Sequence, residues 1–119
     1  MAIFAELRTL IRLERQYLPF VETIEDRNIL TEIGYHETEA APLSLKLLFL
    51  LNISSIATIQ RRLARLVSLA MIVKRRSNGD KRVSTLHLSD ELRDRFRRYE
   101  SDLNGNGVIG NGWNGRGHQ

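Results

Sequence analysis

Basic side chains are concentrated in one short part of this chain. Between Thr58 and Arg82 the sequence holds eight Lys and Arg residues but one acid, Asp80. Ammonium and guanidinium groups at this density bind phosphates, and guanidinium groups also form paired hydrogen bonds with guanine. The cluster therefore predicts the binding of a polyanion. Its members are Arg61, Arg62, Arg65, Lys74, Arg75, Arg76, Lys81 and Arg82.

The charge elsewhere has the opposite sign or is nearly balanced. Residues 1–42 carry four Arg against eight acids, and residues 83–103 carry four Arg against five acids. A patch of one sign attracts polyanions and repels surfaces of like charge, which favours a nucleic-acid partner. A solvated basic face without a partner is the alternative interpretation of the same charges.

Composition limits the class of protein. The 119 residues are 42% hydrophobic and 27% charged, which is typical of one globular domain. The absence of cysteine excludes disulfides and cysteine-ligated zinc. The longest apolar run, Leu47 to Leu51, is much shorter than the roughly 20 residues of a membrane span, and the N-terminus does not resemble a secretory signal. We expect a cytoplasmic protein with no membrane partner, associated with the nucleoid when it binds DNA.

The elements that must position the basic cluster follow from periodicity. A first helix is expected over residues 3–18, ended by Pro19. A second begins at the N-cap Thr23, with Asp26 in the position of a capping box, and Gly34 supplies its C-terminal stop. Residues 35–42 are expected to form a loop. A third helix, apolar on nearly all sides, spans 44–51 and is expected to be surrounded by other elements.

A tight turn and a capped helix come next. Asn52 suits a left-handed turn position, and Ser55 (or Ser54) caps a fourth helix that extends to about Ala70. Its buried stripe is expected to be Ile56, Ile59, Leu63, Leu66 and Ala70, and its outer face Thr58, Gln60, Arg61, Arg62, Arg65 and Ser68.

The period then changes to that of a β-hairpin over residues 71–88. Asn78-Gly79 can adopt the positive φ angles of a tight turn, and Leu86 and Leu88 are expected to share the buried face. Ser89 caps a last helix over 90–103. Residues 104–119 are rich in Gly and Asn and are expected to be a disordered tail, so the folded domain is 1–103.

Helix, turn, capped helix and basic hairpin is the order of a winged helix-turn-helix. The fold class is therefore mostly α with a small β-hairpin wing and flanking N- and C-terminal helices. In such a fold the helix 55–70 enters the major groove and the wing 71–88 contacts the backbone or minor groove. The predicted DNA-binding residues are Ser55, Thr58, Gln60, Arg61, Arg62, Arg65, Lys74, Arg75, Arg76, Lys81 and Arg82.

Two motifs resemble the MarR family of bacterial transcription regulators. "SIATIQRRL", from Ser55 to Leu63, is similar to that family's recognition helix, and Asp80-Lys81-Arg82 followed by "LHLS" is similar to its wing signature. The resemblance covers about residues 23–103 and implies that Arg82 enters the minor groove while Asp80 orients its guanidinium. It also implies a homodimer joined through the terminal helices. Ala70 departs from the family pattern, which has glycine there.

Enzyme and metal chemistry have weaker support. His36, Glu37 and Glu39 could be read as a metal cluster, but a solvated loop is the better interpretation. His87 alternates with leucines on the wing strand and is expected to be exposed or to face DNA. No nucleophile elbow accompanies the serines, and no phosphate-loop motif is present, so we expect no enzyme activity, no metal and no cofactor.

The leading hypothesis is a sequence-specific regulator that binds double-stranded DNA. One alternative is a winged-helix protein of phage or plasmid replication or of the nucleoid, which would use the same surface. Another is a winged helix that docks proteins without nucleic acid. The sequence does not identify the operator, the target genes, an effector ligand, or activation as opposed to repression.

Overall fold

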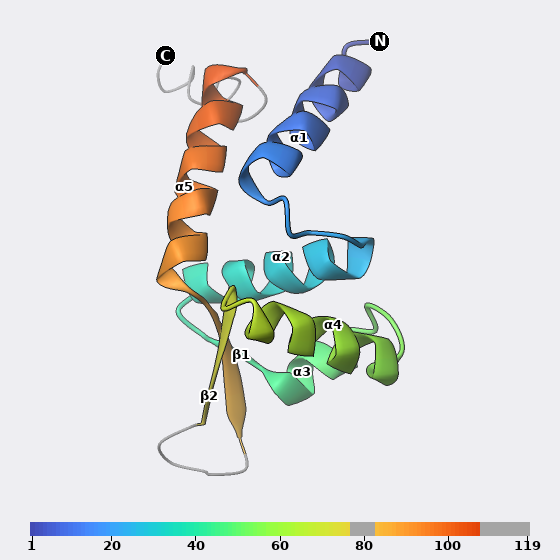
Figure 1. Ribbon diagram of the computed structural model, residues 1–119, viewed down its shortest axis with the longest axis vertical. Coiled ribbons are helices and arrows are strands. Elements are labelled where there is room, and N and C mark those ends of the chain that lie inside the picture. Colours follow the sequence, from blue (N-terminus) through green and yellow to red (C-terminus); the bar gives the residue numbers. More distant parts are fainter. Residues whose placement is uncertain (77–82, 108–119) are drawn as a thin grey trace. The chain divides into compact units, whose positions relative to one another are not determined.

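The computed structural model describes residues 1–76 and 83–107, and within them the chain divides into two compact units (Figure 1). Among the described residues, unit 1 combines residues 1–20 with 93–107, and unit 2 combines residues 21–76 with 83–92. The elements are α1 (Ile3–Tyr17), α2 (Ile24–Thr38), β1 (Leu43–Ser44), α3 (Leu45–Leu50), α4 (Ile56–Ser68), β2 (Ile72–Arg76), β3 (Ser84–Leu88) and α5 (Asp90–Gly105). The predicted fold class, mostly helical with a small hairpin, is confirmed.

In unit 1, α1 and α5 are joined by aromatic and polar contacts. The Tyr17 ring stacks with that of Tyr99 at 6.3 Å between centroids, and Tyr99 stacks in the same way with Phe96. The Tyr17 hydroxyl donates a hydrogen bond to Asp102, and this bond raises the pKa of the tyrosine. The helix ends before Pro19, as predicted. No helix within the described ranges is long and apolar enough to cross a bilayer.

Helix α2 begins as predicted but ends later. Thr23 is the N-cap, and a complete capping box joins it to Asp26. The prediction that Gly34 stops the helix is wrong, and the expected loop at residues 35–38 is helical. The stop is Ala40, whose φ is 57°. The Ala40 N–H donates to Glu37 and the next N–H donates to His36, so the last carbonyls are satisfied without glycine.

The sheet of unit 2 has three antiparallel strands in the order β1-β3-β2. Ile72 lies opposite Leu88, and Arg76 lies opposite Ser84, which confirms the predicted hairpin strands. The predicted turn at 78–79 lies outside the described residues. Strand β1 was not predicted, because two residues are too short for an alternating pattern to be recognised; Leu43 pairs with Leu86 across it.

The core of unit 2 lies between α2, α4 and the sheet. Leu86 and Leu88 share the buried face, as predicted. Helix α3 contributes less than expected, because Leu48 is buried whereas Leu50 is 66% exposed, so the expectation of a fully surrounded helix is wrong. The apolar side chains that are at most 1% exposed are Ile29, Ile33, Leu43, Leu48, Ile59, Leu66, Ile72, Leu86 and Leu92.

Helix α5 begins where the sequence predicts. The Leu92 N–H donates to Ser89 Oγ at 3.1 Å, which is the expected cap. The helix continues to Gly105, two residues beyond the predicted boundary. The rest of the expected tail, residues 108–119, lies outside the described residues.

Candidate nucleic-acid interface

The turn before α4 is formed as predicted. Asn52 has a φ of 56°, and Ser55 is the N-cap of α4. The Thr58 N–H donates to Ser55 Oγ at 3.2 Å, and the Ser55 hydroxyl donates to Thr58 Oγ1 at 3.0 Å. Both side chains predicted to meet DNA therefore take part in the cap of this helix.

The exposed side of α4 is a narrow stripe. Its residues recur every three or four positions, which places them on one side of the helix, away from the buried Ile59, Leu63 and Leu66. The stripe consists of Ala57, Gln60, Arg61, Ala64 and Ser68. This outer face is rotated relative to the predicted one, because Thr58, Arg62 and Arg65 are only partly exposed. At the N-terminal end of the predicted buried stripe, Ile56 is 57% exposed.

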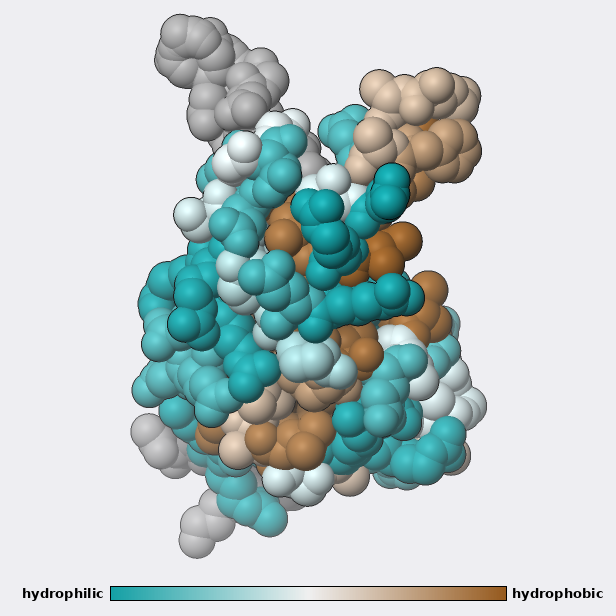
Figure 2. Space-filling view, turned by 45° about the horizontal axis from the view of Figure 1, so that its top comes forward, coloured by the Kyte–Doolittle hydropathy of each residue, from teal (hydrophilic) through white to brown (hydrophobic). Residues whose placement is uncertain are grey.

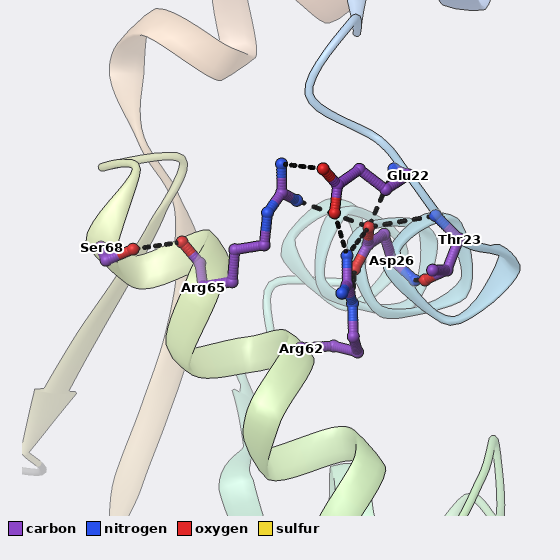
Figure 3. Close-up of polar contacts among 6 residues, drawn as sticks. All are labelled: Glu22, Thr23, Asp26, Arg62, Arg65 and Ser68. Atoms are coloured by element: carbon purple, nitrogen blue, oxygen red, sulfur yellow. Dashed lines mark hydrogen bonds and ion pairs between the residues drawn. The ribbon is translucent and has the colours of Figure 1, made fainter.

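Arg62 lies on the side of α4 that contacts α2, not on the outer face (Figure 3). Its side chain is 15% exposed. Its Nε and Nη2 donate to the two carboxylate oxygens of Asp26 at 2.8 and 2.7 Å, and Nη2 also donates to Glu22 at 2.9 Å. The expectation that Arg62 faces DNA is corrected here, since its Nε and Nη2 both donate to acids of the same unit.

Arg65 lies beside Arg62 and is directed toward the same acids (Figure 3). Its Nη2 is 3.3 Å from Glu22 and its Nη1 is 3.6 Å from Asp26. With a side chain 27% exposed, Arg65 lies between the outer face and the α2 contact. Of the three arginines predicted on this helix, the structure therefore places Arg61 on the open surface.

The described basic residues of the wing are exposed at the end of β2. Because side chains alternate along a strand, Lys74 and Arg76 project from one face of the hairpin and Arg75 projects from the other. Lys74 lies opposite Leu86, and Arg75 lies opposite Thr85. Asp80, Lys81 and Arg82, the predicted wing-tip residues, lie outside the described residues.

His87 was predicted to be exposed or to face DNA, but the structure shows it largely buried. Its side chain is 13% exposed, with Nε2 at 2.8 Å from Thr85 Oγ1 and Nδ1 at 3.8 Å from the carboxylate of Glu37 on α2. His36 is also engaged locally, since its Nδ1 is 2.8 Å from the carbonyl oxygen of Glu32. Within the described part of the chain, no three His, Asp or Glu side chains gather as metal ligands would.

The stripe on α4 has the chemistry of base readout. Gln can bond in a paired manner to adenine, and Arg to guanine, from the major groove. Gln60 and Arg61 stand between Ala57 and Ala64, whose small side chains allow the helix to approach a surface closely. The N-terminal end of α4 adds a partial positive charge from the helix dipole, which suits a phosphate. The arrangement can therefore combine base contacts with backbone contacts.

Sequence reasoning did not identify Asp26 and Glu22 as partners of the arginines. Asp26 was recognised as a cap, but its contacts with a residue 36 positions later depend on how α4 packs against α2. One signal was present: aspartate occupies the capping-box position at which glutamate or glutamine is usual. The shorter side chain keeps this carboxylate close to the helix, where Arg62 reaches it.

Comparison with known proteins gives likeness at the level of structure. No protein-family model matches the chain, and no curated protein matches it. A mutant MarR from E. coli complexed with operator DNA is 21% identical, over 86% of this chain and 71% of that chain, with a TM-score of 0.57. A mutant of S. aureus MepR is 15% identical, over 87% and 73%, with a TM-score of 0.62.

A third structure extends the likeness to nearly the whole chain. The transcriptional regulator Tm0710 from Thermotoga maritima is 19% identical, over 97% of this chain and 83% of that chain, with a TM-score of 0.60. At such identities the likeness establishes the fold. The chain has the MarR-like winged-helix fold that its sequence motifs predict.

Proposed function

We propose that this protein is a sequence-specific transcription regulator that binds double-stranded DNA, with α4 in the major groove and the hairpin 71–88 on the backbone or minor groove. The observation that carries the proposal is the exposed stripe on α4. Gln60 and Arg61 are presented between two alanines, directly before a strand that ends in exposed Lys74, Arg75 and Arg76. The E. coli MarR, which shares the fold, was solved in complex with operator DNA, and this supports DNA as the partner.

The structure changes which residues we assign to the DNA. Gln60 and Arg61 are the base-reading candidates, and the wing supplies phosphate contacts from Lys74, Arg75, Arg76, Lys81 and Arg82, with Asp80 in its wing-orienting role. Ser55 and Thr58 shape the leading turn that approaches the duplex. Arg62 is no longer proposed as a DNA contact. Arg65 is proposed as a peripheral phosphate contact only, because of its acidic neighbours.

We further propose a homodimer joined through residues 3–18 and 90–103. Two modules on a two-fold axis read half-sites about 34–36 Å apart, which a lone module cannot do. Helix α1 carries an unusually apolar exposed face, seen as brown and tan surface at the upper right of Figure 2. The large apolar side chains exposed on it are Ile3 at 48%, Phe4 at 66%, Leu7 at 42% and Ile11 at 53%. An exposed apolar helix face of this kind marks an interaction site.

The test is selection of bound duplexes from random DNA, followed by titration of the selected site and a scrambled duplex in increasing salt. About five phosphate contacts per protomer predict a slope of log K against log salt of about −4 to −5. A selected consensus that outcompetes the scrambled duplex supports the proposal. Binding without sequence preference would favour a nucleoid role, and a site confined to replication origins would favour replication. Absence of salt-dependent binding would favour a protein-docking winged helix.

A further inference from the structure

Asp26 is the buried charged residue of the described chain, with 0% exposure. An isolated carboxylate in such a place is strongly disfavoured, so its partners must compensate for lost hydration. Its two oxygens receive four hydrogen bonds from two different parts of unit 2. Two come from the Arg62 guanidinium on α4, and two come from the backbone N–H groups of Glu22 and Thr23, at 2.9 and 3.2 Å.

These bonds keep the carboxylate ionised. Burial alone would raise the pKa of Asp26, but the hydrogen bonds from Arg62, Glu22 and Thr23 outweigh it and lower that pKa. The pKa of Arg62 is raised in turn, first by its hydrogen bond to Asp26 and then by that to Glu22. Both charges are therefore present at neutral pH, and the pair remains intact under the conditions in which DNA is bound.

The pair joins the start of α2 to the middle of α4 in a defined geometry. A two-pronged arginine–carboxylate contact fixes both distance and orientation, which apolar contacts between two helices do not. Successive residues of an α-helix are about 100° apart around its axis, so Arg62 directs Gln60 and Arg61 as parts of one rigid body. Any rotation of α4 that moved Arg62 from Asp26 would turn Gln60 and Arg61 by the same angle.

We propose that Asp26 is a positioning residue for DNA recognition, which acts through Arg62 to set the rotation of α4 about its own axis. This inference rests on the proposed function of α4 and names a determinant of its specificity outside the DNA surface. Buried ion pairs contribute little net stability compared with apolar replacements, and their best-attested use is to fix a register. Here the register is the set of side chains that α4 presents outward.

The exposed acid of this cluster, Glu22, provides a matched control. Glu22 also contacts Arg62 and Arg65, but its side chain is 56% exposed, and its removal leaves the two-pronged contact in place. Glu22→Gln should therefore preserve the orientation of α4. It changes a charge at the same cluster without changing the geometry, so it separates the two effects.

The experiment compares wild type, Glu22→Gln and the double variant Asp26→Asn with Arg62→Met on a selected site and on a scrambled duplex. The double variant removes both buried charges while Asn keeps an oxygen for the capping N–H groups. It should lose about tenfold or more in preference for the selected site. Its affinity for the scrambled duplex and its salt slope should match wild type, because the phosphate contacts lie elsewhere. An unchanged preference would overturn the inference.

A second variant and a DNA-free measurement keep the result decisive. If the double variant does not fold, Arg62→Lys retains the charge but loses the two-pronged contact, and it should show a smaller loss of preference. Residual dipolar couplings of the free protein report the orientation of α4 relative to α2. They should change in the Asp26 and Arg62 variants but not in Glu22→Gln. If the wild type proves to have no sequence preference, the proposed function fails, while these couplings still decide whether Asp26 orients α4.

Discussion

The carboxylate of Glu37 accepts a hydrogen bond of 3.0 Å from the backbone N–H of Leu88, joining the last turn of α2 to the end of β3. The same carboxylate lies 3.8 Å from His87 Nδ1. One partly buried acid thus holds the base of the wing to the helix behind it. Residues 35–38 were expected to belong to a loop, and their helical structure is what brings Glu37 to this position.

Removal of this contact should loosen the wing base. We expect Glu37→Ala to lower the free energy of unfolding by about 1–3 kcal/mol, because it leaves a backbone donor of β3 without its acceptor. Glu37→Gln retains a side-chain oxygen and should cost less. Urea denaturation of both variants measures the difference, and equal losses would show that the charge matters more than the acceptor.

Base readout should depend on Gln60 and Arg61. Alanine at either position should cost about 1–3 kcal/mol on the selected duplex and much less on scrambled DNA, because the lost bonds are to base edges. Lys74→Ala should weaken both complexes equally and reduce the salt slope by about one. Fluorescence anisotropy titrations provide both numbers. Equal losses for all three variants on both duplexes would show that α4 does not read bases.

Acid stability should depend on Asp26. Its pKa is lowered in the folded protein, so its contribution is present above the ordinary pKa of an aspartate and is lost as the pH falls through the lower, folded-state value. Wild type should therefore lose stability relative to Asp26→Asn below about pH 4, with a constant difference at higher pH. Denaturation of both proteins from pH 3 to 7 tests this, since the other carboxylates are common to both. A constant difference throughout would mean that Asp26 is not specially stabilised.

Ala70 occupies a backbone conformation that favours glycine. Its φ is 61°, and it closes α4 with hydrogen bonds from its own N–H to Val67 and from Met71 to Leu66. We expect Ala70→Gly to raise the free energy of unfolding by up to about 1 kcal/mol, because relief of the left-handed strain exceeds the added chain entropy. The matched control is Ala64→Gly, within the right-handed helix, which should lower it by about 0.5–1 kcal/mol. Thermal melts of the two variants should shift in opposite directions.

The exposed face of α1 should determine self-association. Substituting Phe4 and Ile11 by Asp places charges on an apolar surface, which should shift the protein toward monomer and weaken binding to a two-half-site duplex. The Asn28→Asp variant adds a similar charge at an exposed position of α2, outside the proposed interface, and should not. Sedimentation at micromolar concentration distinguishes the two. A wild-type monomer under these conditions would exclude the dimer.

Much of the fold could be predicted because its signals are local. Thr23, Ser55 and Ser89 each cap the helix expected of them, and the hairpin strands follow the change in period. The end of α2 was misassigned, because glycine is a common helix terminator but Ala40 adopts the left-handed conformation instead. That choice depends on the hydrogen bonds available after the helix, which residue type alone does not specify.

The site was predicted less completely, because charge in a sequence does not show direction. Arg61 and Arg62 are adjacent and chemically identical, yet one is exposed and the other contacts Asp26. A helical projection places Arg62 near the edge of the buried stripe, and the acid that receives it belongs to another helix. The contacts of Asp26 with Arg62, and of Glu37 with Leu88, join residues distant in sequence, so they can be identified only when the packing of α2 is known.

The position of β3 between two strands has a consequence for how the unit opens. Thr85 and Leu86 pair with β1 on one side, through Ser44 and Leu43, and with β2 on the other side. Ser84 pairs with β2. Separation of the hairpin at Arg76 and Ser84 can occur locally, but separation at Leu86 also releases the residues that lead into α3. The distance between the wing base and the helix-turn-helix is therefore fixed, and local fluctuations of the outer hairpin leave it unchanged.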